Sequence, residues 1–186
     1  MGIEMNKALF LDRDGTIIWD KHHQHKPEDI KLIPGVAEVL AKARSAGYLF
    51  FLFTNQSGVG RGLFTMEDVY ICNQRMLELL GLGEGLFADI CIAPEHPDDP
   101  VIYRKPCPRF ILEMIEKHEL DPAQCSMVGD RVSDWGAGLG AGITPIAVKT
   151  GKDFDEKAKG YILDHDVAVY DDLVAYVEEL LKDFLV

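Results

Sequence analysis

Two acidic side chains, Asp12 and Asp14, directly follow an apolar run at residues 8–11. If that run is a buried strand, both carboxylates lie at its carboxyl end, where they can share a divalent cation. In phosphoryl transfer, one carboxylate would attack phosphorus, while the other would protonate the leaving oxygen and then activate water. Gly15 permits a sharp turn there. Taken alone, an Asp-x-Asp-Gly turn is also typical of an ordinary loop or of part of a calcium loop.

Three further polar clusters follow along the chain. Residues 54–58 offer a hydroxyl, amides and backbone N–H groups that suit a phosphate, although alone they would be a polar turn. Lys105, fixed by the proline after it, could balance a carboxylate and a phosphoryl group, although such a pair is usually a solvated loop. Asp130 precedes Asp134 by one helical turn, and alone it would be the N-cap of a helix. Together the clusters supply the groups that phosphoryl transfer needs.

Short apolar runs alternate with helical periodicity, and these elements must position the clusters. The runs that predict buried strands are residues 8–11, 48–53, 90–93, 126–128 and 146–148. Apolar residues recur at helical spacing between them, as at positions 36, 39, 40 and 43. The alternation predicts an α/β fold, a Rossmann-like three-layer sandwich with a central parallel sheet. The irregular stretches 19–29 and 94–108 should then border a ligand site at the carboxyl edge.

The composition is typical of a globular protein. The 186 residues carry 19 basic and 31 acidic side chains, and the net charge of −12 disfavours nucleic acid and anionic membranes as partners. Apolar stretches are too short to span a bilayer and no signal-peptide pattern is visible, so a cytoplasmic protein is expected. No repeat or linker appears, which predicts a single domain over residues 1–186, working as a monomer or weak oligomer. The four cysteines form no CxxC pair and should be reduced.

The order of the four clusters resembles the haloacid dehalogenase (HAD) superfamily of phosphohydrolases. The matching segments are DRDGT at 12–16, TNQSG at 54–58, RKP at 104–106 and GDRVSD at 129–134. Within the superfamily, the chain is similar to the branch of the histidinol phosphatases and heptose bisphosphate phosphatases. The segments TNQSGVGRGLFT at 54–65 and VKTG at 148–151 favour the heptose enzymes. The resemblance covers about residues 7–151, with no insertion long enough for a separate cap domain, which indicates the capless subgroup.

The resemblance implies a role for each cluster. Asp12 would be the nucleophile and Asp14 the acid/base, while Thr54 and Lys105 would bind the phosphoryl group. The positions expected to contact substrate are Asp20, Lys21, His22, His23, Asn55, Gln56, Ser57, Arg104 and Arg131.

The same resemblance implies a metal requirement. Mg²⁺ (magnesium) would be held by the Asp12 carboxylate, the Asp14 backbone carbonyl and the Asp130 carboxylate. Asp134 would orient Lys105 or a water bound to the metal.

A second metal is expected to be missing. The relatives often carry a zinc-binding loop before the RKP segment, and its four ligand places fall here on Ala93, Glu95, Val101 and Tyr103. None is a thiolate or imidazole, so no structural zinc is predicted. Cys91, His96 and Cys107 lie nearby, but their spacing is wrong for a zinc site. Five prolines could stiffen this loop instead, by restricting φ.

The histidines of the first irregular stretch have two interpretations. His22, His23 and His25 next to Asp20 could bind transition metals adventitiously, and a solvated polar loop is the simpler interpretation. The functional alternative is that one of them contacts the distal part of the substrate.

The expected function is therefore Mg²⁺-dependent hydrolysis of a small phosphorylated metabolite, foremost a heptose bisphosphate, through an aspartyl-phosphate intermediate. The alternatives are a histidinol-phosphate phosphatase and a polynucleotide 3′-phosphatase, which residues 60–62 and 103–106 would also fit. The net charge of −12 counts against the polynucleotide enzyme. A non-enzymatic phosphometabolite-binding protein would have no use for a nucleophile.

Overall fold

The computed structural model describes residues 5–21 and 24–182. Six parallel strands form one sheet in the order β3-β2-β1-β4-β5-β6. The strands are β1 (Asn6–Leu11), β2 (Tyr48–Asn55), β3 (Asp89–Ala93), β4 (Leu120–Gly129), β5 (Thr144–Val148) and β6 (Ala168–Tyr170). All five predicted strand segments are confirmed, and β6 is an edge strand that the sequence did not predict.

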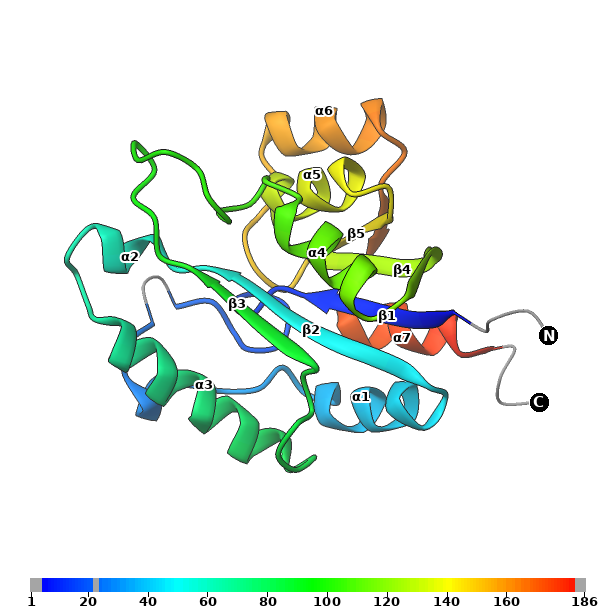
Figure 1. Cartoon of the computed structure of the whole chain (residues 1–186), viewed down its shortest axis with the longest axis horizontal. Coiled ribbons are helices and arrows are strands. Elements are labelled where there is room, and N and C mark those ends of the chain that lie inside the picture. Colours follow the sequence, from blue (N-terminus) through cyan, green and yellow to red (C-terminus); the bar gives the residue numbers. More distant parts are fainter. Residues whose placement is uncertain (1–4, 22–23, 183–186) are drawn as a thin grey trace.

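Helices cover both faces of the sheet. They are η1 (Pro27–Asp29), α1 (Val36–Ser45), α2 (Ser57–Gly60), α3 (Met66–Leu80), α4 (Arg109–Lys117), α5 (Val132–Gly140), α6 (Glu156–Asp164) and α7 (Leu173–Leu180). In Figure 1, α1, α3 and α7 lie on one side of the sheet and α4, α5 and α6 lie on the other. This arrangement confirms the three-layer α/β fold with a central parallel sheet.

Alternation along the central strand explains the two cores. Leu9 and Leu11 of β1 pack with the residues of α1, α3 and α7, whereas Ala8 and Phe10 pack with those of α4 and α5. Successive side chains of a strand point to opposite faces, so an uninterrupted apolar run is what a strand buried on both faces requires.

Local sequence signals fix where two of the helices begin. Gly35 has a positive φ of 81° immediately before α1, and Thr65 forms a capping box with Asp68 at the start of α3. The capping box pairs two backbone N–H groups that the first turn of a helix otherwise leaves without a partner. Gly35 and Thr65 therefore mark the residues at which α1 and α3 begin.

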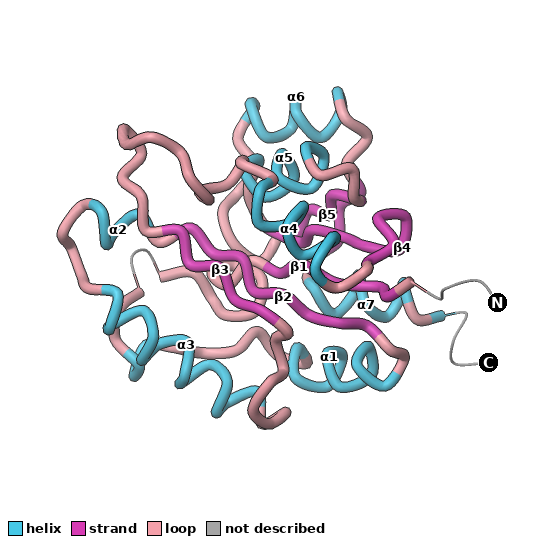
Figure 2. The backbone as a smooth tube through the Cα atoms, in the orientation of Figure 1, coloured by secondary structure: helices cyan, strands magenta, loops and turns pink. Residues whose placement is uncertain are grey.

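The loop at residues 94–108 and the described residues of the stretch 19–29 lie at one end of the sheet. The tube in Figure 2 shows the loop after β3 rising beside α2, at the end where the strands finish. Throughout the described residues, no helix is both long enough and apolar enough to cross a membrane.

Candidate active site

The polar clusters meet at the carboxyl edge of the sheet, where a cavity of about 390 Å³ opens. Asp12 directly follows β1, Thr54 lies near the end of β2 and Asp130 directly follows β4. The predicted residues in the cavity wall are Asp12, Asp14, Asp20, Asn55, Gln56, Ser57, Arg104, Lys105, Arg131 and Asp134. Thr54 and Asp130 are buried next to this wall, so the structure brings the four clusters together.

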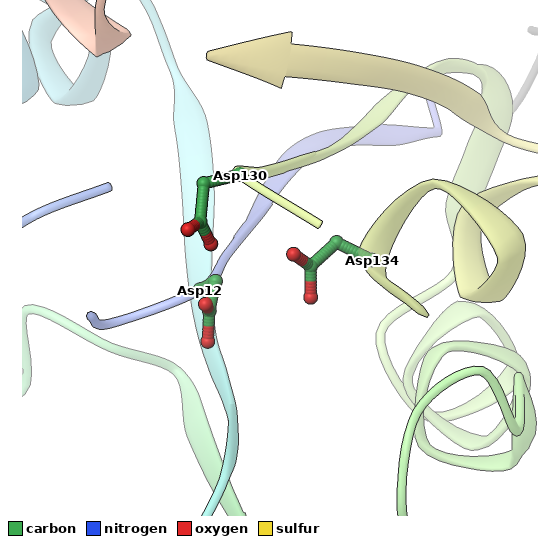
Figure 3. Close-up of side chains that lie close together, drawn as sticks. All are labelled: Asp12, Asp130 and Asp134. Atoms are coloured by element: carbon green, nitrogen blue, oxygen red, sulfur yellow. The ribbon is translucent and has the colours of Figure 1, made fainter. Parts of the chain in front are cut away.

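Three carboxylates converge in the site. One oxygen from each of Asp12, Asp130 and Asp134 lies within 4.8 Å of the others, and all three residues are buried. Figure 3 shows the side chains of Asp130 and Asp134 reaching toward Asp12, from the end of β4 and from the first turn of α5. Burial, with the Asp134 and Asp12 charges, raises the pKa of Asp130 to about 7. Among the described residues, Asp130 Oδ1 has no hydrogen-bond donor, and Arg131 Nε lies 3.7 Å away from it. Such carboxylate oxygens are the ligands that a hard divalent cation takes.

The segment after β5 holds the other oxygen of Asp130. The backbone N–H of Lys152 donates to Asp130 Oδ2 at 2.9 Å, and the Thr150 hydroxyl donates to the Gly15 carbonyl at 2.7 Å. A Cβ at Gly151 would lie 2.0 Å from Asp130 Oδ2. The glycine of the VKTG segment therefore allows the backbone to approach this carboxylate.

Lys105 links two of the acids. Its Nζ lies 2.8 Å from Asp12 Oδ1 and 2.6 Å from Asp134 Oδ1, and it donates to the Phe53 carbonyl at 2.6 Å. Burial lowers the pKa of Lys105, but the Asp12 and Asp134 carboxylates outweigh that effect and hold it above the ordinary value. The ammonium group is therefore a fixed positive charge next to Asp12.

Asp14 is held by a residue that the sequence analysis did not single out. Arg13 is fully buried, with Nη2 3.0 Å from Asp14 Oδ2, and its Nη1 donates to Asn73 of α3 at 2.9 Å. The Gln56 amide donates to both Asp14 Oδ2 and Thr54 Oγ1 at 2.9 Å. Burial raises the pKa of Asp14 although Arg13 opposes it. An arginine between two acids was the signal available in the sequence; its contact with Asn73, 60 positions away, was not visible there.

The start of α5 corrects one interpretation. Asp130 is not the N-cap of that helix, because the cap position belongs to Arg131. The Arg131 backbone N–H donates to Asp134 Oδ2 at 2.9 Å, so the acid one turn into the helix binds the cap residue. This leaves Asp130 free of a capping role and directed into the acid cluster.

Comparison with known proteins decides the family. The HAD-hydrolase-like family model matches residues 102–176. The D-glycero-beta-D-manno-heptose-1,7-bisphosphate 7-phosphatase of Haemophilus influenzae is 36% identical over 170 residues, which cover 86% of this chain and 92% of that protein. The Helicobacter pylori protein of the same name is 41% identical over 137 residues, 73% of this chain and 79% of that one. The chain belongs to the heptose-1,7-bisphosphate phosphatase family of HAD-like hydrolases.

A solved structure agrees with this membership. The D,D-heptose 1,7-bisphosphate phosphatase from B. bronchiseptica, complexed with magnesium and phosphate, superposes with a TM-score of 0.82 at 30% identity, covering 95% of this chain and 99% of that one. The resemblance to HAD phosphohydrolases is therefore confirmed for the fold and the family.

In this HAD-like hydrolase, three guanidinium groups line the cavity. Arg104 and Arg131 were predicted, whereas Arg61 was not proposed as a contact residue. Arg131 Nη2 donates to Asp20 at 2.9 Å, and Arg104 Nε is buried with no hydrogen-bond partner in the part of the chain that the structure describes. Gln24, also missed, lines the cavity and is buried.

Other predicted contacts have different surroundings. Lys21 lies outside the cavity wall, exposed and 3.5 Å from Asp29, while His22 and His23 fall outside the described residues. His25 stacks on Phe64, with ring centroids 5.6 Å apart. Asn55 lines the cavity, but its amide is bonded to the backbone of Lys105, accepting from its N–H at 2.9 Å and donating to its carbonyl at 3.1 Å.

Proposed function

We propose that this chain is a Mg²⁺-dependent phosphatase that hydrolyses a heptose bisphosphate through an aspartyl-phosphate formed on Asp12. The observation that carries the proposal is the buried acid cluster, in which Lys105 Nζ lies 2.8 Å from Asp12 Oδ1. Asp14, two residues after Asp12, is the candidate acid/base. We infer the substrate from the relatives in the heptose-1,7-bisphosphate phosphatase family. The substrate is a small phosphorylated molecule, not a nucleic acid.

In the first step, an Asp12 carboxylate oxygen forms a bond to phosphorus as the bond to the leaving oxygen breaks. Asp14 gives its proton to that oxygen, and its raised pKa favours the protonated state that this requires. The Lys105 ammonium group balances negative charge on the phosphoryl oxygens, and Thr54 stabilises them by a hydrogen bond. Because Thr54 Oγ1 accepts from Gln56, its own hydroxyl hydrogen is free to donate to the phosphoryl group.

In the second step, Asp14 takes a proton from water, whose oxygen attacks the phosphorus. The bond between phosphorus and Asp12 breaks, which releases inorganic phosphate and restores the Asp12 carboxylate. Arg13 and Gln56 keep Asp14 oriented through both steps, because each donates to Oδ2 of that carboxylate.

The residues present fit a magnesium ion. The Asp12 carboxylate, the Asp14 backbone carbonyl and Asp130 would hold it, and the Asp130 oxygen without a hydrogen bond is the supporting observation. When bound, Mg²⁺ would neutralise negative charge on the phosphoryl group. The absence of structural zinc stays a prediction, which metal analysis of the purified protein checks.

The arginines of the cavity wall suit a second phosphate. Arg61, Arg104 and Arg131 line the cavity of an otherwise acidic protein, and one guanidinium group can bind two phosphate oxygens at once. Asp20 and Ser57, also in the wall, would contact sugar hydroxyls. The predicted contacts at Lys21, His22 and His23 remain predictions.

We further propose that residues 1–186 form one hydrolase domain that works in the cytoplasm as a monomer or weak oligomer. The single continuous sheet supports one domain.

Phosphate release across a substrate panel tests the function. The panel holds heptose bisphosphates, histidinol phosphate, hexose phosphates and a 3′-phosphorylated oligonucleotide, each with Mg²⁺ and with a chelator. We expect a heptose bisphosphate to give the highest kcat/KM, and only with Mg²⁺. A higher value for histidinol phosphate or the oligonucleotide would replace the proposed substrate.

A matched variant tests the nucleophile. Asp12→Asn should lower kcat by at least ~10³-fold, because an amide oxygen is a poor nucleophile, while thermal unfolding shows an intact fold. Substantial activity left in this variant would refute the role of Asp12.

A further inference from the structure

The loop between β3 and α4 carries Arg104 and Lys105 to the cavity, and one carboxylate bridges its two sides. Glu95, just after β3, accepts hydrogen bonds at Oε1 from three successive backbone N–H groups. These donors are Ile102 at 3.2 Å, Tyr103 at 2.7 Å and Arg104 at 3.2 Å. Successive N–H groups that converge on one anion form a nest, a strong backbone site for a carboxylate.

The Glu95 carboxylate is held in its charged form. Its partial burial favours the neutral acid, but the backbone donors, Tyr103 first, outweigh that effect and hold the pKa of Glu95 below its ordinary value. Its other oxygen, Oε2, is buried and makes no hydrogen bond within the described part of the chain. The bridge therefore rests on Oε1 alone.

Both sides of the bridge are anchored. On the β3 side, Gly60 of α2 donates to the Pro94 carbonyl at 3.0 Å, and a Cβ at Gly60 would lie 2.5 Å from the backbone nitrogen of His96. On the Arg104 side, the Tyr103 hydroxyl donates to Glu113 of α4 at 3.0 Å. Glu95 thus connects the backbone beside α2 to the backbone beside α4.

Arg104 lies between two fixed neighbours. Glu95 holds the N–H groups of Tyr103 and of Arg104 itself, and Asn55 holds both backbone polar groups of Lys105. The Arg104 side chain lines the cavity, and its buried Nε finds no hydrogen-bond partner among residues 5–21 and 24–182. A guanidinium that makes few bonds of its own depends on its backbone for its position.

We propose that Glu95 is a positioning residue that sets the place of Arg104, and with it the recognition of the substrate's anionic group distal to the reacting phosphate. This inference rests on the proposed function, since it assumes a substrate with two anionic groups. Lys105 keeps its own anchors at Asn55, Asp12 and Asp134, so loss of Glu95 should weaken distal binding and spare the chemistry.

Kinetics on two substrates test this division. Glu95→Ala should raise KM for a heptose bisphosphate on the order of tenfold with kcat little changed. It should leave kcat/KM for phenyl phosphate, which lacks a distal anion, within about twofold. Glu95→Gln keeps one oxygen acceptor for the three N–H groups and should fall between wild type and Glu95→Ala. Asp98→Ala, which removes a carboxylate of the same loop that is 90% exposed, is the control and should change the kinetics of neither substrate.

A double variant tests whether Glu95 acts through Arg104. In a protein that already carries Arg104→Ala, adding Glu95→Ala should lower kcat/KM only slightly more, because the guanidinium group that Glu95 positions is already gone. Additive losses would overturn the proposal. So would equal losses on both substrates, which indicate a merely structural role.

Amide hydrogen exchange separates this inference from the proposed function. Glu95→Ala should speed exchange at residues 102–104 and leave the central strands unchanged. If the wild-type protein hydrolyses no substrate of the panel, the proposed function fails, while exchange still tests the bridge. Unchanged exchange at residues 102–104 would overturn the role of Glu95 whatever the activity.

Discussion

The ammonium nitrogen of Lys105 lies 2.6 Å from Asp134 Oδ1, and each of the two side chains is only 1% exposed to solvent. The same nitrogen contacts Asp12, so one cation faces two carboxylates, with Asp130 also close by. The site therefore carries an excess of buried negative charge, which costs folding free energy and suits the binding of a cation.

Asp134→Asn should separate activity from stability. We expect kcat to fall by roughly ten- to a hundredfold, because Lys105 loses one of the two carboxylates that fix it beside Asp12. The free energy of unfolding without metal should stay within about 1 kcal/mol of wild type or increase, since one buried negative charge is removed. Steady-state kinetics and urea unfolding measure the two effects.

The control for this variant is Asp89→Asn, which breaks the exposed pair between Asp89 and Lys117 at 2.6 Å. Exposed pairs contribute about 0–1 kcal/mol, so both quantities should be nearly unchanged. An Asp134→Asn protein with wild-type kcat would show that Lys105 needs no second carboxylate.

Arg13→Met should change the pH dependence of turnover. Arg13 lowers the pKa of Asp14 against the effect of burial, so its removal should raise that pKa further. Asp14 then stays protonated up to a higher pH, so the basic limb of the plot of kcat against pH should shift to higher pH. Loss of orientation should also reduce the maximal kcat by roughly tenfold.

Asn73→Ala provides the comparison, because it removes the support of Arg13 and keeps the positive charge. We expect a lower kcat with a smaller shift of the basic limb. Identical pH profiles for the Arg13→Met and wild-type proteins would exclude Arg13 as a partner of the acid.

Stability of the metal-free protein should rise on mild acidification. The pKa of Asp130 is about 7 in the folded protein, against 3.8 as its ordinary value. At any pH between these two values, Asp130 therefore takes up a proton when the chain folds. Stability from this group is present at low pH and is lost as pH rises toward 7. Between pH 8 and pH 6 the free energy of unfolding should gain about 1 kcal/mol from Asp130.

Urea unfolding with a chelator, at pH 6 and pH 8, measures this gain, and Asp130→Asn should lack it. Added Mg²⁺ should stabilise the wild-type protein more at pH 8 than at pH 6, because the ion competes with the proton for Asp130. An equal pH response in wild type and Asp130→Asn would show that Asp130 is already ionised at pH 6.

Gly151→Ala should weaken magnesium binding. The new methyl group would lie 2.0 Å from Asp130 Oδ2, so the carboxylate or the backbone that donates to it must shift. We expect the Kd for Mg²⁺ to rise by roughly ten- to a hundredfold, measured by calorimetry. Gly160→Ala in α6 is the control, because a Cβ there meets open space, and it should leave the Kd unchanged. Equal Kd values in both variants would contradict the close approach.

Much of the sheet and the main acidic residues could be predicted from the sequence. Short apolar runs mark the buried strands, because a strand covered on both faces has no polar side to interrupt it. Parallel strands end at one edge, so motifs placed after them had to meet there. The edge strand β6 escaped because it has only three residues, two of them exposed.

Only the tertiary structure decided which partners the site residues take. Arg13 meets Asn73, Lys105 meets Asp12 and Asp134, and Arg131 takes the cap position first considered for Asp130. Glu95, noted in the sequence only as an unsuitable zinc ligand, instead binds the backbone at residues 102–104. Periodicity and motif order are local properties that the sequence by itself determines. Which groups pair depends on packing, which only the folded chain fixes, whether they lie 7 positions apart, as Glu95 and Ile102, or 93 apart, as Asp12 and Lys105.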